Sequence, residues 1–159
     1  MKPTIARCIP AVLASVPLIL ATSRAGAAPP TDACSLLTQA QVGTALGVPV
    51  DPGKAPVPKS CHWDQPGKAG AELLKLDVTI TDQKAFDNRK GMRGRSTVTS
   101  VSGLGDDAFY YELASARLAT LNVKKGNVVF VVRVWGGSKP VDEYKVKEKA
   151  VAGAILARL

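Results

Sequence analysis

The stretch LATLNVKKGNVVFVVRVW, residues 118–135, decides the fold. It predicts two strands, 118–123 and 128–135, because apolar and β-branched residues fill both parts and Lys124–Asn127 has the Gly and Asn typical of a hairpin turn. Apart from Arg133, the second strand is apolar on both faces. Such a strand lies inside a sheet and is covered on each side, so the sequence predicts a central hairpin with layers above and below it.

Residues 74–81 have the clearest strand pattern elsewhere in the chain. Leucine, valine and isoleucine at the even positions alternate with lysine, aspartate and threonine at the odd positions. This period of two predicts a strand with one buried and one polar face. Composition predicts shorter strands at 60–65, 97–101 and 108–113, and an edge strand at 48–50 within a Pro- and Gly-rich loop.

Capping residues predict two short helices. Thr38, with a glutamine three residues later, matches a capping box at the start of a helix over 39–46, and Gly47 can end that helix in a left-handed conformation. Asp82 is the predicted N-cap of a helix over 83–90.

A longer helix is predicted at the end of the chain. Ser138 is its predicted N-cap, Pro140 lies in its first turn, and the helix runs for about 18 residues with one apolar stripe. Together the elements predict an α+β fold, namely an α/β/α sandwich with a mainly antiparallel sheet and helices on both faces. The stripe consists of Tyr144, Val151, Ala152, Ile155, Leu156 and Leu159.

The first 27 residues have the pattern of a cleavable secretory signal peptide. Lys2 and Arg7 form a positive region, residues 8–21 are mostly apolar, and Ala25–Ala27 is a small-x-small cleavage site. The alternative, a retained membrane anchor, is disfavoured because 14 residues of helix span about 21 Å of a core that is about 30 Å thick. We therefore expect an exported protein, periplasmic or extracellular.

Cleavage leaves a short disordered leader, 28–33, and one globular domain, 34–159. We expect this domain to be a monomer with no membrane span. Three basic residues leave with the signal peptide, which lowers the net charge from +8 to about +5.

The cysteine count also changes on export. Cys8 leaves with the signal peptide, and the remaining pair in an oxidising compartment predicts a Cys34–Cys61 disulfide. Two free thiols or a metal pair are the alternatives, but the wide separation of the two cysteines is not a metal-ligand spacing.

Four short segments occur together along the chain, namely Asp32–Thr38, Ser60–Trp63, Val101–Ala108 and Val123–Asn127. Their order and spacing resemble a family of small exported bacterial proteins of unknown function, often lipoproteins, with a PsbP-like α/β/α fold. The resemblance implies an antiparallel sheet with helices on both faces, and it implies no activity or catalytic residue. This chain differs from the lipoprotein members because neither Cys8 nor Cys34 follows a lipobox.

Residues with catalytic potential are few. His62 is the only histidine, and it has no predicted nucleophile beside it, so we interpret it as a solvated strand residue. Asp106 and Asp107 are adjacent and point to opposite faces of a strand, so we interpret them as turn formers rather than a carboxylate pair. Gly103 and Gly105 belong to the same turn and lack the Lys-Ser/Thr of a phosphate loop. No catalytic, cofactor or metal site is therefore predicted.

Basic residues concentrate between 84 and 95. Arg89, Lys90, Arg93 and Arg95 are candidate anion-binding residues, because such a cluster attracts carboxylate, phosphate or sulfate groups. A solvated surface is the alternative. Nucleic acid is disfavoured, since no aromatic side chains alternate with the basic ones.

These observations favour a non-enzymatic binding or accessory domain of the cell envelope, whose partner is an envelope protein or an anionic ligand. One alternative is an enzyme with a site built from scattered Asp, Tyr and Lys residues, such as Asp107, Tyr110 and Tyr111. The other alternative is a purely structural envelope protein.

Overall fold

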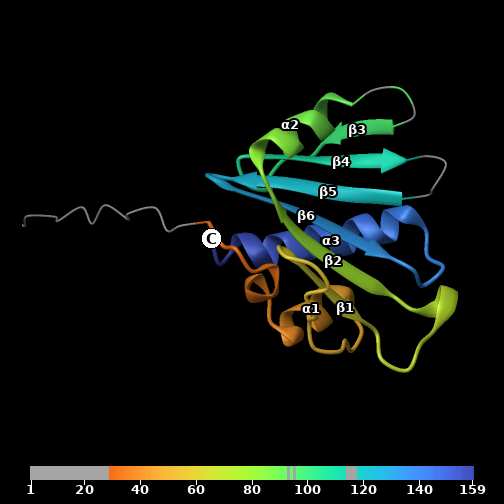
Figure 1. Cartoon of the computed structure of the whole chain (residues 1–159). Helices are drawn as coiled ribbons and strands as arrows, with labels where there is room; N and C mark the ends of the chain where they lie inside the picture. The colour runs from red at the N-terminus through yellow and green to blue at the C-terminus, as the bar shows by residue number, and fades with distance from the viewer. Residues whose placement is uncertain (1–28, 93, 95, 114–117) are drawn as a thin grey trace, which may run out of the picture.

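One six-stranded antiparallel sheet and three α-helices form the fold seen in the computed structural model, which describes residues 29–92, 94, 96–113 and 118–159 (Figure 1). The α+β class predicted from the sequence is confirmed. The predicted signal peptide, 1–27, lies outside the described residues. Within the described part of the chain, no helix is long and apolar enough to cross a membrane.

The predicted hairpin forms the centre of the sheet, as its apolar composition indicates. The strands are β1 (Ser60–Asp64), β2 (Lys75–Thr81), β3 (Ser96–Ser100), β4 (Asp107–Leu113), β5 (Leu118–Lys125) and β6 (Val128–Trp135). Their order in the sheet is β1-β2-β6-β5-β4-β3, and every neighbouring pair is antiparallel. The strand with alternating apolar and polar residues, β2, pairs with β6 along its full length.

The two faces of the sheet are covered unequally. On what we call the first face, α3 (Val141–Leu156) packs across β5 and β6 and against α1 (Gln39–Leu46) (Figure 1). On the opposite, second face, α2 (Gln83–Gly91) lies beside β4, where the Phe86 and Phe109 rings meet edge-on with centroids 4.9 Å apart. No other helix of the described residues covers the second face.

The main hydrophobic core lies on the first face and a much smaller one lies under α2. The prediction that β6 is covered on both sides is therefore confirmed only near Val129, which is buried with Phe86. Val131, two residues further along the same face, is only partly buried. The end of the second face beyond α2 is open.

The predicted disulfide is present, with Sγ–Sγ 1.98 Å between Cys34 and Cys61. It joins the 3-10 helix η1 (Ala33–Leu36) to β1. Asp32 caps η1 by accepting a hydrogen bond from the Cys34 N–H, and Ala33, expected in the leader, is fully buried in the core. Ala33 therefore packs with the globular domain.

The predicted capping of the two short helices is confirmed. Thr38 Oγ1 accepts the Gln41 N–H, the Gln41 side chain accepts the Thr38 N–H, and Gly47 ends α1 with φ of 71°. The Asp82 carboxylate accepts the Ala85 N–H at 2.7 Å at the start of α2.

The predicted start of the third helix is wrong. Pro140 is its N-cap rather than a first-turn residue, and the helix has 16 residues. Ser138 cannot cap it because its backbone is left-handed, with φ of 50°, and its hydroxyl donates to the Ala71 carbonyl. Leu159, placed in the apolar stripe, lies beyond the helix and is exposed.

The edge strand predicted at 48–50 is also wrong. Pro49 and Pro52 lack the N–H that a ladder needs, so pairing here is sparse. The chain instead contacts β1 through a hydrogen bond from the Asp51 N–H to the Asp64 carbonyl and an isolated bridge between Lys54 and His62.

The central hairpin opens into a seam. Pairing between β5 and β6 ends at Leu121 and Val132, although β5 continues along β4 to Leu118 and β6 continues along β2 to Trp135. The two central strands therefore separate at the end away from their turn.

Candidate functional site

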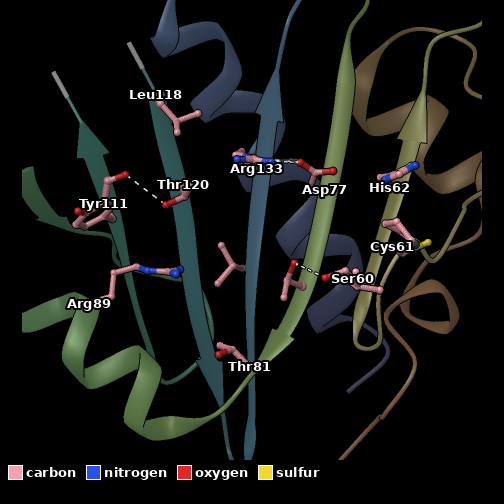
Figure 2. A pocket seen from close by; sticks show the side chains of 14 residues that line it. Ser60, Cys61, His62, Asp77, Thr81, Arg89, Tyr111, Leu118, Thr120 and Arg133 are labelled. Atoms are coloured by element: carbon pink, nitrogen blue, oxygen red, sulfur yellow. Dashed lines mark hydrogen bonds and ion pairs between the residues drawn. The ribbon is translucent and has the colours of Figure 1, made fainter. Parts of the chain in front are cut away.

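The open part of the second face forms a pocket of about 410 Å³ between α2 and residues 56–62 (Figure 2). This volume is within the range of roughly 300 to 1,000 Å³ that is typical of small-molecule sites. Its lining residues are Pro56, Val57, Ser60, Cys61, His62, Asp77, Thr79, Thr81, Arg89, Tyr111, Leu118, Thr120, Val131 and Arg133.

Strand alternation builds the pocket floor. Side chains of a strand point alternately to the two faces, so the residues between those of the main core line the second face. Val131 and Thr79 lie opposite each other in the β2–β6 register, and Thr120 of β5 lines the same pocket. The Ser60 and Thr79 hydroxyls are hydrogen-bonded at 3.0 Å. The floor therefore combines an apolar centre with hydroxyl groups.

Asp77 is the acidic residue of the lining, and three donors converge on one of its oxygens. Arg133, its register partner on β6, donates from Nη2 at 2.5 Å and from Nε at 3.1 Å, and the Trp135 indole N–H donates at 2.8 Å. The Arg133 charge is thus balanced within the pocket wall. Figure 2 shows this pair across β6 and β2.

Arg89 reaches from α2 over the sheet without an acidic partner. Its Nη1 donates to the Asn122 Oδ1 at 2.8 Å, and Asn122, only 1% exposed, donates from Nδ2 to the Thr120 carbonyl at 3.1 Å. Within the described residues, no carboxylate forms an ion pair with Arg89. The pocket wall therefore carries one positive charge that a neutral amide holds in place.

Glu148 of α3 lies at the seam between β5 and β6 and is fully buried. Its Oε1 accepts the Val134 N–H at 2.9 Å, and its Oε2 has no hydrogen-bond partner among the described residues. Burial raises the pKa of Glu148 to about 8, although the Val134 hydrogen bond and the Lys145 charge oppose this shift. Glu112 adds to the rise and holds Lys145 in an ion pair at 2.8 Å.

The two candidate anion-binding residues that the structure describes, Arg89 and Lys90, have different surroundings. Arg89 lines the pocket, whereas Lys90 binds Asp107 of β4 with Nζ–Oδ2 2.5 Å. Arg93 and Arg95 lie outside the described residues. The cluster predicted from the sequence thus contributes Arg89 to the pocket, and its role in anion binding stays a prediction.

The scattered residues proposed for an enzyme site lie on opposite faces. Tyr110 is buried on the first face and donates to the Lys145 carbonyl at 2.7 Å, and burial raises its pKa. Tyr111 lines the pocket on the second face, and Asp107 is paired with Lys90. The structure does not bring these three side chains together.

His62 and Asp106 lie in different parts of the structure. His62 lines the pocket from β1. Asp106 accepts hydrogen bonds from the Gly126 N–H at 2.6 Å and from Lys125 at 3.0 Å, and these contacts lower its pKa. Asp106 thus ties the turn before β4 to the β5–β6 turn.

Over the described residues, no group of three or more His, Cys, Asp or Glu side chains is placed to hold a metal ion.

Sequence reasoning missed most of the pocket. Asp77 and Thr79 were visible as the polar face of an alternating strand, but that pattern does not tell a solvated face from a pocket floor. Arg133 was visible as the single charge in an apolar strand, and the carboxylate that it would meet depends on the β2–β6 register. Asn122 carried no sequence pattern that predicts burial beneath an arginine.

The fold and the pocket define a class of protein: a disulfide-bonded α+β domain with a small-molecule-sized pocket on one face of its sheet. No protein-family model matches the chain, and no curated protein or solved structure does so either. Inference about function therefore depends on the geometry of the pocket.

Proposed function

We propose that this protein is an exported, non-enzymatic binding domain of the cell envelope, and that it binds its ligand in the second-face pocket. The observation that supports this proposal is the incomplete cover of the central strands. Apolar residues such as Val131 stay accessible there, next to polar groups fixed by their own hydrogen bonds. An apolar pocket with a few oriented polar groups is the usual form of a ligand site.

Export is supported by two features. The Cys34–Cys61 disulfide is typical of an oxidising compartment, and the first 27 residues carry the signal-peptide pattern. We further propose a periplasmic or extracellular monomer. A PsbP-like fold is part of this proposal, and the antiparallel sheet with helices on each face supports it.

A role without catalysis is supported by the hydrogen bonds that the polar groups of the pocket already make with other residues. Three hydrogen bonds from Arg133 and Trp135 engage one oxygen of Asp77 and hold this carboxylate against the pocket wall. Arg89 is positioned by a neutral amide oxygen rather than by a carboxylate. These groups can orient a ligand without reacting with it.

The test is to recover the ligand from the native envelope. The protein is purified under native conditions and denatured, and the released small molecules are identified by mass spectrometry. Val131→Trp fills the pocket floor, and Val146→Trp is the control because Val146 lies on α3 and is 69% exposed. We expect one species with the wild type and with Val146→Trp that is absent with Val131→Trp. Identical profiles from all three proteins would contradict a binding role for the pocket.

A further inference from the structure

We propose that the pocket takes a small organic acid and binds its single carboxylate through Arg89. This inference rests on the proposed function and names the class of ligand for the same site. Arg89 lines the pocket wall, and its described contact there is a hydrogen bond to a neutral side chain.

The charges of the lining select for one negative charge. Arg89 and Arg133 are the cations and Asp77 is the anion of the described lining, and Asp77 is committed to Arg133. One uncompensated positive charge remains. A carboxylate balances this charge, whereas a phosphate monoester with a charge of about −1.5 to −2 exceeds it.

The position of Arg89 suits a bound carboxylate. Asn122 is buried and takes one Nη1 hydrogen bond, which fixes the guanidinium over the floor. A guanidinium has five N–H donors in a planar fork, so donors remain for a carboxylate, which this fork can bind through two parallel hydrogen bonds. Figure 2 shows Arg89 extending toward the middle of the pocket, with Tyr111 and Thr120 on the neighbouring strands.

The remaining lining residues indicate what kind of chain the acid carries besides its carboxylate. Val131 and Leu118 offer apolar contact, and the Thr79 and Thr81 side chains add hydroxyl groups. The volume of about 410 Å³ lies toward the small end of ligand sites. These features fit a short apolar or hydroxylated chain that carries one carboxylate at its end.

The experiment is a titration of ¹⁵N-labelled protein followed by heteronuclear NMR. The probes are hexanoate, its neutral counterpart hexanamide, and the dianion hexyl phosphate. Arg89→Gln removes the guanidinium group that we propose binds the carboxylate. Lys84→Gln is the matched control, because Lys84 is an exposed cation of the same helix outside the lining.

We expect hexanoate to shift the amide signals of Thr120 and Val131 and to bind about ten- to a hundred-fold more tightly than hexanamide, as a charged hydrogen-bonding group does. Arg89→Gln should remove this preference and Lys84→Gln should keep it. The inference is overturned if hexanoate fails to shift these signals, if hexyl phosphate binds more tightly than hexanoate, or if both variants weaken hexanoate equally.

Failure of this inference differs from failure of the proposed function. Equal binding of hexanamide and hexanoate at Thr120 and Val131 would remove the role of Arg89 as a carboxylate ligand and leave the pocket as a binding site. Loss of the pocket as a binding site would instead appear in the mass-spectrometric comparison, as identical profiles from wild type and Val131→Trp.

Discussion

The Glu148 carboxyl group accepts a hydrogen bond from the Val134 backbone N–H at 2.9 Å, at the point where β5 has separated from β6. Val134 has its β2 partner, Leu76, but the β5 register has already ended. An unpaired N–H in the core would cost stability. The Glu148 side chain of α3 therefore supplies the hydrogen-bond acceptor that β5 does not provide here. Glu148 thus stabilises an open seam in the centre of the sheet.

This arrangement predicts that stability falls as pH rises. The pKa of Glu148 is about 8 in the folded protein, above its usual value of 4.5, because burial disfavours the charged form. The folded state therefore binds more protons than the unfolded state between these values. Its free energy of unfolding should decrease as pH rises from 4.5 to 8, by about 3 to 5 kcal/mol from this group. Urea denaturation at a series of pH values measures this decrease.

Glu148→Gln separates the effect of Glu148 from those of its charged neighbours Lys145, Glu112 and Arg133. The amide oxygen can still accept the Val134 N–H, but the side chain no longer titrates. We expect this variant to resemble the wild type near pH 4.5 and to be more stable near pH 8. Glu143→Gln, an exposed change on the same helix, should follow the wild-type profile. A Glu148→Gln profile parallel to that of the wild type would contradict the prediction.

The disulfide should contribute about 3 to 4 kcal/mol to the free energy of unfolding, because it closes a loop with a sequence separation of 27. Thermal unfolding with and without reductant measures the contribution. The Cys34→Ser/Cys61→Ser double variant is the control and should not respond to reductant. Thiol titration of the unfolded full chain should find Cys8 alone before reduction, and detection of all three thiols would contradict the bond.

Gly53 should resist substitution because of close packing. A Cβ at this position would lie 2.8 Å from the Cys61 Sγ and 2.8 Å from the Trp63 ring, and both side chains are buried. Gly53→Ala should therefore lower the free energy of unfolding by about 1 to 3 kcal/mol. Gly91→Ala is the control, since nothing lies within 4 Å of its Cβ position. Equal stability of the two variants in urea denaturation would contradict this account.

Local patterns predicted most of the fold because they act over a few residues. The capping box at Thr38 and the alternation of residues 74–81 each specify an element through its own hydrogen bonds or period, and both are present in the structure. The third helix differs because Ser138 follows two glycines with positive φ and bonds instead to Ala71, 67 residues earlier. Long-range competition of this kind has no local pattern.

The pocket was less predictable because it depends on pairing across the sheet. Asp77 and Arg133 are 56 residues apart and meet only because β2 pairs with β6 in one register. The sequence shows that Arg89 is a cation, but the direction in which its side chain extends follows from the packing of α2 through Phe86. The polar face of β2 could equally have been a solvated surface.

The balance of Asp77 against Arg133 yields a final prediction about selectivity. Asp77→Asn leaves the Arg133 charge uncompensated, so the pocket gains a second net positive charge while the amide oxygen can still accept a hydrogen bond. The relative affinity for hexyl phosphate over hexanoate should then rise about ten-fold, since the dianion gains more Coulomb energy from the added charge. Asp64→Asn is the matched control, because Asp64 is an acid of β1 that pairs with Lys75 outside the lining. A rise confined to Asp77→Asn means that the ligand contacts the Arg89 and Arg133 side of the pocket. An equal change of the phosphate-to-carboxylate affinity ratio in both variants would contradict this prediction, because the general charge of the protein would then determine the ratio.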